Sequence, residues 1–218
     1  MSIDRVGLSA KQRLVLTAER LYAVHGLDGV PLRQIVAEAG MGNKTAVQYH
    51  FGSKEGLIQA ILVNRLDDLD RRRELLQARV PANNLRAVVE AHQLPLIELA
   101  EDDNCFYLPF LEQLVRKVDP MLALPASNLA AENAYYERVE ELLTDVPIPL
   151  RPIRVRQASA TALHTCADRQ RSRLVGSPVP PYALHVSHLL DSLIAALTAK
   201  PSRETRSALE AWIATGQD

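Results

Sequence analysis

The sequence is poor in the features that would indicate a redox centre, a metal site or a membrane anchor. Its two cysteines, Cys105 and Cys166, lie far apart and form no CxxC or Cys/His spacing, so neither a disulfide framework nor a zinc site is predicted. It has no apolar run near the length of a membrane span, no signal-like start and no low-complexity tract. We therefore expect a soluble cytoplasmic protein without a metal or other cofactor, in which both cysteines are reduced core residues.

Patterns typical of enzymes are also missing. No Gly-rich phosphate loop and no GxSxG elbow occur. The best constellation is His185, His188 and Asp191, three potential metal ligands at near-helical spacing. No Glu-containing metalloprotease pattern accompanies them, and the two histidines border a Leu-rich face where histidines commonly pack. The sequence therefore favours a protein that is not an enzyme.

Charge is distributed unevenly along the chain. Residues 1–54 carry seven Lys/Arg against four Asp/Glu, whereas the remainder carries eighteen against twenty-two, within a net charge of −1. The N-terminal part is therefore mildly basic and the rest is acidic. This is the sign expected if the N-terminal part meets phosphate and the rest does not.

The first 53 residues predict three short helices. Apolar side chains recur at helical spacing over 9–25, after Ser9, which can cap the first turn. Pro31, at the first helical position, opens a second helix, which stops at Gly40. Asn43 can cap a third helix at 44–50, so that two short helices flank a tight turn. Three such helices are the minimum that can bury these apolar faces together.

The rest of the chain predicts further helices. From Ser53 a helical pattern continues to about Val80, where Pro81 ends it. No stretch shows sustained period-two alternation, and the two Pro-rich pieces at 146–149 and 177–181 are expected to be rigid connectors. We predict an all-α fold with a helix-turn-helix domain at 1–53 and a helical domain at 54–218. The later helices are expected at about 83–101, 104–118, 127–144, 151–173, 182–199 and 203–215.

Two stretches of the N-terminal part resemble the tetracycline-repressor (TetR) family. They are Ile35-Val36-Ala37-Glu38-Ala39-Gly40-Met41 and Tyr49-His50-Phe51-Gly52-Ser53-Lys54-Glu55-Gly56-Leu57. The first stretch is similar to the family's Ile-Ala pair and Ala-Gly turn. The second is similar to the end of the family's recognition helix, which closes with Phe, and to the Ser-Lys-Glu that opens the fourth helix. The resemblance covers about a quarter of the chain. It implies a three-helix DNA-binding unit attached to a ligand-binding and dimerising helical domain.

The turn before the third helix departs from the family pattern. The segment 41–48 is about one residue longer than the usual turn, and Gln48 stands where the family commonly has a Tyr. We interpret this as a subgroup variant.

The side chains around the third helix can contact DNA. A cation, a hydroxyl, an amide and a phenol can reach base edges and phosphates in a major groove, and Gln48 can pair bidentately with adenine. By resemblance, Lys54 lies on backbone phosphate. Taken alone, Phe51 favours the core, Tyr49 fits core and contact equally, and His50 more often packs than reads bases. The predicted DNA-binding residues are Arg33, Lys44, Thr45, Gln48, Tyr49, His50 and Lys54.

The resemblance also implies a small-molecule site among the middle helices, which would need a mostly apolar cavity with a few polar groups. Candidates include Gln93, Met121, Tyr136 and Thr165. The residues we select as ligand-binding are His92, Glu98, Tyr107, Phe110, Gln113, Tyr135 and His164.

The last long helices present broad apolar faces. Paired with symmetry mates they would form a four-helix dimer interface; alternatively, these faces pack inside one subunit. The predicted interface residues are Leu163, Val186, Leu189, Leu190, Leu193, Ile194 and Leu197.

Together these observations predict a homodimeric transcriptional repressor that binds a pseudo-palindromic double-stranded DNA operator and is released by a small-molecule effector. The alternative from another class is a helical interaction protein that keeps the DNA-binding-like unit but acts through a protein partner.

Overall fold

The computed structural model describes residues 8–81 and 83–215. Every regular element in these ranges is helical, which confirms the predicted all-α fold. None of the helices there is both long and apolar enough to cross a lipid bilayer. The elements are α1 (Ala10–His25), α2 (Leu32–Glu38), α3 (Ala46–Phe51), α4 (Lys54–Gln77), α5 (Leu85–Leu99), α6 (Tyr107–Val115), η1 (Pro120–Ala123), α7 (Ala126–Leu142), η2 (Ile148–Leu150), α8 (Arg151–Leu174), α9 (Tyr182–Thr198) and α10 (Arg203–Ala214).

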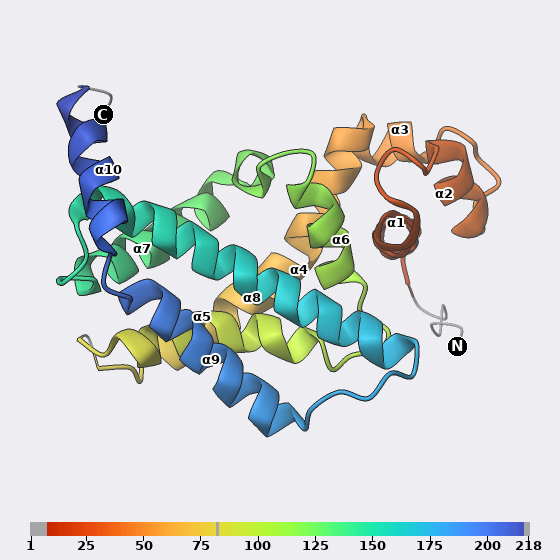
Figure 1. Cartoon of the computed structure of the whole chain (residues 1–218). Coiled ribbons are helices and arrows are strands. Elements are labelled where there is room, and N and C mark those ends of the chain that lie inside the picture. The colour runs from red at the N-terminus through yellow and green to blue at the C-terminus, as the bar shows by residue number, and fades with distance from the viewer. Residues whose placement is uncertain (1–7, 82, 216–218) are drawn as a thin grey trace.

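The helices form two groups joined by α4. Figure 1 shows α1, α2 and α3, here called the head, gathered at one end of the molecule. The helices from α5 onward form the body, and α10 projects from it at the end remote from the head (Figure 1). The 24-residue α4 runs from one group into the other and connects them.

Local capping signals explain where the head helices begin and end. The Ser9 hydroxyl accepts a hydrogen bond from the Gln12 amide at 3.2 Å, and the Gln12 side chain accepts one from the Ser9 amide at 3.0 Å. This reciprocal capping box satisfies two amides that α1 cannot pair internally. The helix ends before Gly26, which has φ 75°, a value that favours glycine. The prediction of a helix at 9–25 is therefore confirmed.

The third helix starts two residues later than predicted. Asn43 was expected to cap a helix at 44–50, but α3 begins at Ala46 and its N-cap is Thr45. The Asn43 Oδ1 instead accepts hydrogen bonds from the Thr45 amide at 2.9 Å and the Thr45 hydroxyl at 2.8 Å. This side-chain turn holds residues 43–45 outside the helix, because it offers the backbone a local alternative to helical pairing.

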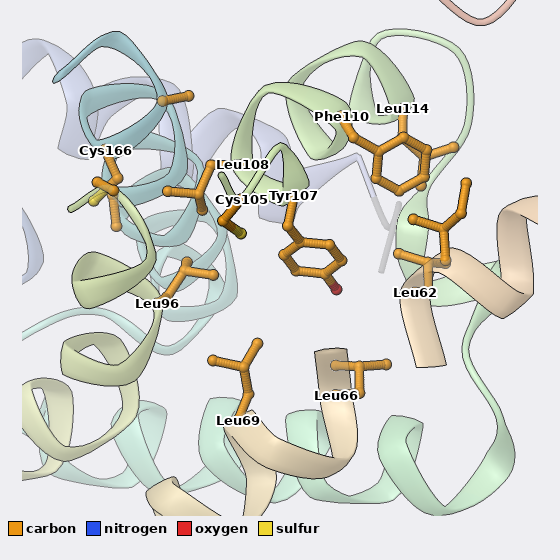
Figure 2. Packing of buried hydrophobic residues seen from close by; sticks show 14 of the residues in the cluster. Leu62, Leu66, Leu69, Leu96, Cys105, Tyr107, Leu108, Phe110, Leu114 and Cys166 are labelled. Carbon is orange, nitrogen blue, oxygen red and sulfur yellow. The ribbon is translucent and has the colours of Figure 1, made fainter. Parts of the chain in front are cut away.

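A continuous apolar core links head and body. In Figure 2, Leu62, Leu66 and Leu69 of α4 face the inward side chains of α5, α6 and α8. Burying each such side chain, relative to leaving it exposed to water, contributes roughly 1.5–3 kcal/mol to the stability of the folded state. The core reaches the head because the Phe110 ring of α6 lies 6.4 Å from the Tyr22 ring of α1, centroid to centroid. Both cysteines are buried and free, as predicted.

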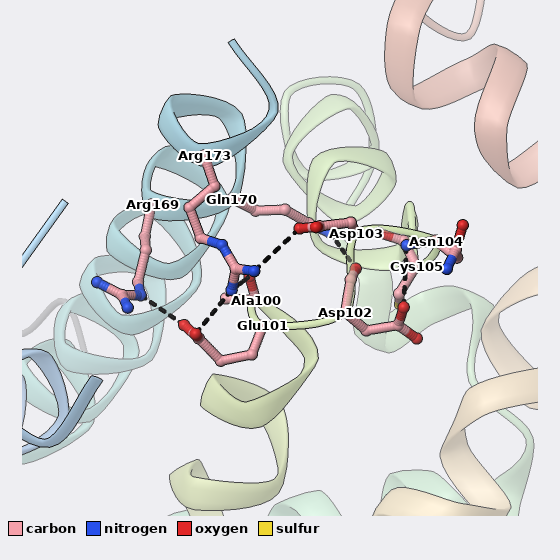
Figure 3. A network of polar contacts seen from close by, with 9 residues as sticks. All are labelled: Ala100, Glu101, Asp102, Asp103, Asn104, Cys105, Arg169, Gln170 and Arg173. Carbon is pink, nitrogen blue, oxygen red and sulfur yellow. Dashed lines mark hydrogen bonds and ion pairs between the residues drawn. The ribbon is translucent and has the colours of Figure 1, made fainter. Parts of the chain in front are cut away.

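The loop between α5 and α6 is fastened on both sides. On the body side, Arg169 of α8 donates to Glu101 at 2.6 Å, and Arg173 pairs with Glu101 and Asp103 at 2.6 and 3.1 Å (Figure 3). On the head side, the Glu19 carboxylate of α1 accepts a hydrogen bond from the Phe106 amide at 3.0 Å. The loop that starts α6 is therefore a fixed joint between α8 and α1.

Candidate nucleic-acid interface and body cavity

The outer face of α3 is exposed and chemically varied. Ala46 and Val47 are buried and hold α3 on the head, whereas Gln48 and Tyr49 point outward. Tyr49 is 81% exposed, which is unusual for a large aromatic side chain. Of the two positions that the sequence left open for it, core or surface, Tyr49 therefore lies at the surface. Such a face offers an amide and a phenol to a partner.

The turn before α3 adds a cation and a hydroxyl to this surface. Lys44 and Thr45 are both exposed. Because the Thr45 hydroxyl donates to Asn43, its oxygen is oriented to accept a hydrogen bond from an outside donor. Arg33, at the start of α2, is exposed and forms no ion pair with any residue of the described ranges. We call Arg33, Lys44, Thr45, Gln48 and Tyr49 the α3 surface.

The remaining predicted DNA-binding residues are less free. His50 is half-buried and its ring meets the Tyr49 ring edge-on, with centroids 4.9 Å apart. The Lys54 ammonium donates to the Leu27 carbonyl at 2.6 Å and lies 3.9 Å from the Asp28 carboxylate. Lys54 therefore ties the loop after α1 to the start of α4, and its phosphate contact stays a prediction. Phe51 is half-buried against the core.

Gly56, in the first turn of α4, lies close to the backbone at the end of α3. A Cβ added to it would lie 2.0 Å from the Phe51 carbonyl oxygen, whereas a Cβ on Gly42 would meet no atom within 4 Å. We expect Gly56→Ala to push α4 away from the end of α3 and to lower the free energy of unfolding by about 1–3 kcal/mol. Gly42→Ala is the matched control and should change it by no more than about 0.5 kcal/mol. Urea unfolding measures both, and equal losses would contradict the proposed close approach.

The body contains a cavity of about 250 Å³ between α4, α5, α6, α7 and α8. Much of its wall is apolar, including Leu62, Leu66 and Leu69 of α4, Leu96 of α5 and Leu111 of α6. Its polar groups come from α4, α5, α6, α7, α8 and the segment before η1, and are Arg73, His92, Gln93, Tyr107, Asp119, Glu132, Tyr136, Arg156 and Ser159.

A buried ionic cluster closes one side of the cavity. Arg73 donates to Glu132 at 2.5 Å, to Asp70 at 3.3 Å and, through Nε, to the His92 carbonyl at 3.0 Å. The His92 ring lies 3.4 Å from the second Glu132 oxygen, and it stacks on the Tyr135 ring with centroids 3.5 Å apart. The guanidinium therefore faces two carboxylates, which neutralise it inside the protein.

Burial lowers the pKa of His92 to about 4, and the positive charge of Arg73 acts in the same direction. Below the ordinary pKa of about 6.5 the unfolded chain binds a proton at this histidine that the folded chain does not. We therefore expect the free energy of unfolding to fall by up to about 1.4 kcal/mol per pH unit as the pH drops from 6.5 to 4.

Urea unfolding at several pH values measures this effect. His92→Gln should flatten the slope in that window, whereas His188→Gln, on the exposed face of α9, should leave it unchanged. An unchanged slope in His92→Gln would show that another group is responsible.

The structure brings together two of the seven predicted ligand-binding residues. His92 and Tyr107 line the cavity. Tyr135 lies behind His92 and lines a second, more polar cavity of about 560 Å³ on the other side of the cluster. Phe110 faces α1, and Gln113 lies beside Gly26. Glu98 pairs with Arg72, while the exposed His164 lies 2.6 Å from Glu112.

Among the wall residues, Arg73 and Glu132 were not predicted. A signal for Arg73 was present, because it continues the spacing of Leu62, Leu66 and Leu69 along one face of α4. No comparable pattern marks Glu132, whose role depends on α7 lying against α4 and α5.

The residues predicted at the dimer interface lie mostly inside the subunit. Leu189, Leu190, Leu193 and Leu197 are 3% exposed or less, so for them the alternative of packing within one subunit describes the structure. Leu163 lines the cavity, and Val186 and Ile194 are half-buried against the core. The reason is that α8, α5 and α9 pack on one another and consume the broad apolar face.

The potential metal ligands of α9 do not form a cluster. Asp191 pairs with Arg86 of α5 at 2.6 Å, and His185 is half-buried beside Arg169. In the parts of the chain that the structure describes, no group of three His, Cys, Asp or Glu side chains is placed to hold a metal ion.

Comparisons with solved structures support the fold. A transcriptional regulator from Rhodococcus sp. Rha1 is 20% identical with a TM-score of 0.55, over 87% of this chain and 96% of that one. PfmR, a TetR-family transcriptional regulator from Thermus thermophilus, is 19% identical with a TM-score of 0.55, over 87% of this chain and all of that one. NalD, the secondary repressor of the MexAB-OprM multidrug efflux pump in Pseudomonas aeruginosa, is 19% identical with a TM-score of 0.52, over 88% and 98%.

No curated protein sequence matches the chain. Residues 14–61 match the family model of bacterial regulatory proteins of the tetR family, and this range contains α2, α3 and the turn between them. The N-terminal part of the chain therefore matches the DNA-binding helix-turn-helix unit of the tetR family of bacterial regulatory proteins, and the fold of the whole chain is similar to that of solved transcriptional regulators.

Proposed function

We propose that this regulator is a cytoplasmic homodimeric repressor, without catalytic activity, that leaves its operator when a small molecule fills the body cavity. The observation that carries the proposal is the α3 surface, where hydrogen-bonding side chains stand exposed on a short helix whose other side is buried. In the proposed complex the predicted DNA-binding domain, residues 1–53, contacts DNA, and the predicted helical domain, residues 54–218, binds effector and partner subunit.

The α3 surface divides into reading and positioning groups. The Gln48 amide can pair with the N6 and N7 of adenine in the major groove, and the Thr45 oxygen can accept a hydrogen bond from a base amine. Arg33 at the start of α2 and Lys44 in the turn before α3 would meet phosphates, which fix the register of the helix on the duplex. Tyr49 can donate to a phosphate from its exposed hydroxyl.

Dimerisation follows from how little DNA one head can read. A six-residue α3 spans few base pairs, so two heads related by a two-fold axis are needed for specific binding. The buried leucines of α9 cannot supply much interface area. We assign the interface to the outward faces of α8 and α9 together with α10, where Leu184, Trp212 and Ile213 are 59%, 41% and 54% exposed.

Effector control is supported by the double role of α6. Tyr107 and Leu111 of α6 line the cavity, while Phe110 of the same helix stacks on Tyr22 of α1. A molecule that widens the cavity must therefore move α6, α4 or both, and each of these helices contacts α1. A ligand that prefers the displaced arrangement would shift the dimer towards a state whose heads no longer fit adjacent grooves.

A gel shift with the region upstream of the protein's own gene tests the proposal, with a random duplex of equal length as control. A repressor should bind the upstream duplex selectively, and as a dimer by analytical ultracentrifugation. Binding no tighter than to the random duplex, or a strictly monomeric complex, would contradict the proposal. Such an outcome would favour the alternative of a helical protein that acts through a protein partner.

A further inference from the structure

One polar group of the body cavity is the Tyr107 hydroxyl. The side chain is 2% exposed, and no hydrogen bond joins its hydroxyl to any residue of the described ranges. Figure 2 shows the hydroxyl pointing away from α6 towards Leu66 of α4. Because Tyr107 lines the cavity, this hydroxyl can donate to or accept from a polar group of a molecule that enters it.

The charges around the cavity disfavour an anion. Arg73 is the one cationic group of the described wall that is buried, and it already faces Glu132 and Asp70. The cluster therefore carries one net negative charge, since His92 is neutral at pH 7. A carboxylate entering the cavity would be a third negative group near one guanidinium, in a setting that screens charge poorly. At the exposed rim, Arg156 contributes one positive charge and Asp119 one negative charge, so the rim adds no net charge.

The size of the cavity suits a molecule of one ring. An apolar cavity of about 150 Å³ holds a benzene molecule. The 250 Å³ observed here accommodates one ring with a short substituent. The wall of Leu62, Leu66, Leu69, Leu96 and Leu111 offers such a ring only apolar contacts, so burial of its surface supplies the affinity.

We infer that the body cavity binds a compact, uncharged, mostly apolar molecule of one-ring size whose hydroxyl pairs with the Tyr107 phenol. This inference deepens the proposed effector role and rests on it for DNA release, although binding itself can be measured without DNA.

Four probes of similar size separate the contributions: 4-propylphenol, propylbenzene, 4-propylbenzoate and 4-propylbenzylamine. Isothermal titration calorimetry on the full-length protein at pH 7.5 should give the tightest binding for 4-propylphenol. We expect at least tenfold weaker binding for the benzoate anion, which the negative cluster repels, and for the benzylammonium cation, whose lost hydration the leucine-lined wall does not replace. Binding of propylbenzene should be about three- to tenfold weaker. Absence of binding by all four, or tighter binding of either ion, would overturn the inference.

Two variants test the named residues. Tyr107→Phe should bring 4-propylphenol within about twofold of propylbenzene, while Tyr182→Phe, a matched loss of a hydroxyl on α9 outside the cavity, should keep the wild-type preference. Glu132→Gln removes one negative charge beside Arg73 and should narrow the gap between phenol and benzoate at least threefold. Melting curves identify any variant that has lost its fold, and an unchanged preference in a folded Tyr107→Phe overturns the role of Tyr107.

The failure of the inference and the failure of the proposed function are distinguishable. If 4-propylphenol binds with the expected preferences but does not release operator DNA in a gel shift, the ligand class stands and effector control fails. If other small molecules release DNA while none of the four probes binds, effector control stands and the ligand class fails.

Discussion

Gln48→Ala is expected to weaken binding to the specific operator by about tenfold to a hundredfold, while binding to random duplex changes by less than about twofold. The reason is that a bidentate pair with a base contributes about 1–3 kcal/mol of discrimination, whereas non-specific binding depends on phosphate contacts. Gln48 is exposed on α3, so its truncation leaves the buried Ala46 and Val47 in place. Fluorescence anisotropy with labelled duplexes at fixed salt measures both affinities.

Gln77→Ala provides the matched control, because it removes the same type of side chain from the far end of α4. It should leave both affinities at the wild-type level. Lys44→Ala should act differently from Gln48→Ala, lowering the affinity for both duplexes and reducing the salt dependence by about one counterion. If Gln48→Ala weakens binding to both duplexes equally, Gln48 contacts the backbone and another side chain reads the sequence.

Arg73→Met is expected to lower the free energy of unfolding by about 3–5 kcal/mol. The substitution leaves Glu132 and Asp70 partly buried without their shared cation, and the loss of one partner of a buried pair carries this cost. Burial alone would raise the pKa of Glu132, but hydrogen bonds from His92 and the positive charge of Arg73 hold it well below its ordinary value. Without Arg73 this carboxylate should take up a proton more readily, so part of the loss should disappear at acidic pH.

The control for this prediction is Arg86→Met. Arg86 pairs with Asp191 at 2.6 Å, but both side chains are substantially exposed, so the loss should be about 0–1 kcal/mol. Adding Glu132→Gln to Arg73→Met should recover part of the stability, since it removes the uncompensated charge. Chemical denaturation measures all three variants, and equal losses for Arg73→Met and Arg86→Met would contradict the buried role of the cluster.

Helix positions were predictable because their signals are local. Ser9 and Ser53 each cap a helix with a side-chain hydrogen bond, and α1 ends before a glycine with positive φ, as the sequence indicated. Asn43 shows how such a signal can mislead. Its side chain can accept a hydrogen bond at the first turn of a helix, or it can accept one from the amide two residues later and hold a turn before the helix. The structure shows the second arrangement, with Ala46 and Val47 buried at the start of α3.

The functional surfaces were less predictable because they depend on contacts between distant segments. An apolar stripe such as Leu189, Leu193 and Leu197 has the same spacing whether it faces its own subunit or a second one. Lys54 was expected to be free for phosphate, but its ammonium is held by Leu27, which lies 27 positions earlier. The exposure of Tyr49 likewise depends on which face of α3 packs against the other helices. A helix of six residues is too short for its apolar periodicity to define that face.

The shared position of α6 restricts where ligand preference can be altered. Within nine residues, α6 provides both part of the cavity wall and the packing against α1, so a substitution chosen to reshape the cavity from this helix also disturbs the head. Leu96, Leu124 and Leu163 line the same cavity from α5, the segment after η1, and α8. Under the proposed effector control, engineering a biosensor for a new inducer should therefore begin at these three positions, because substitutions there leave the packing of α6 on α1 in place.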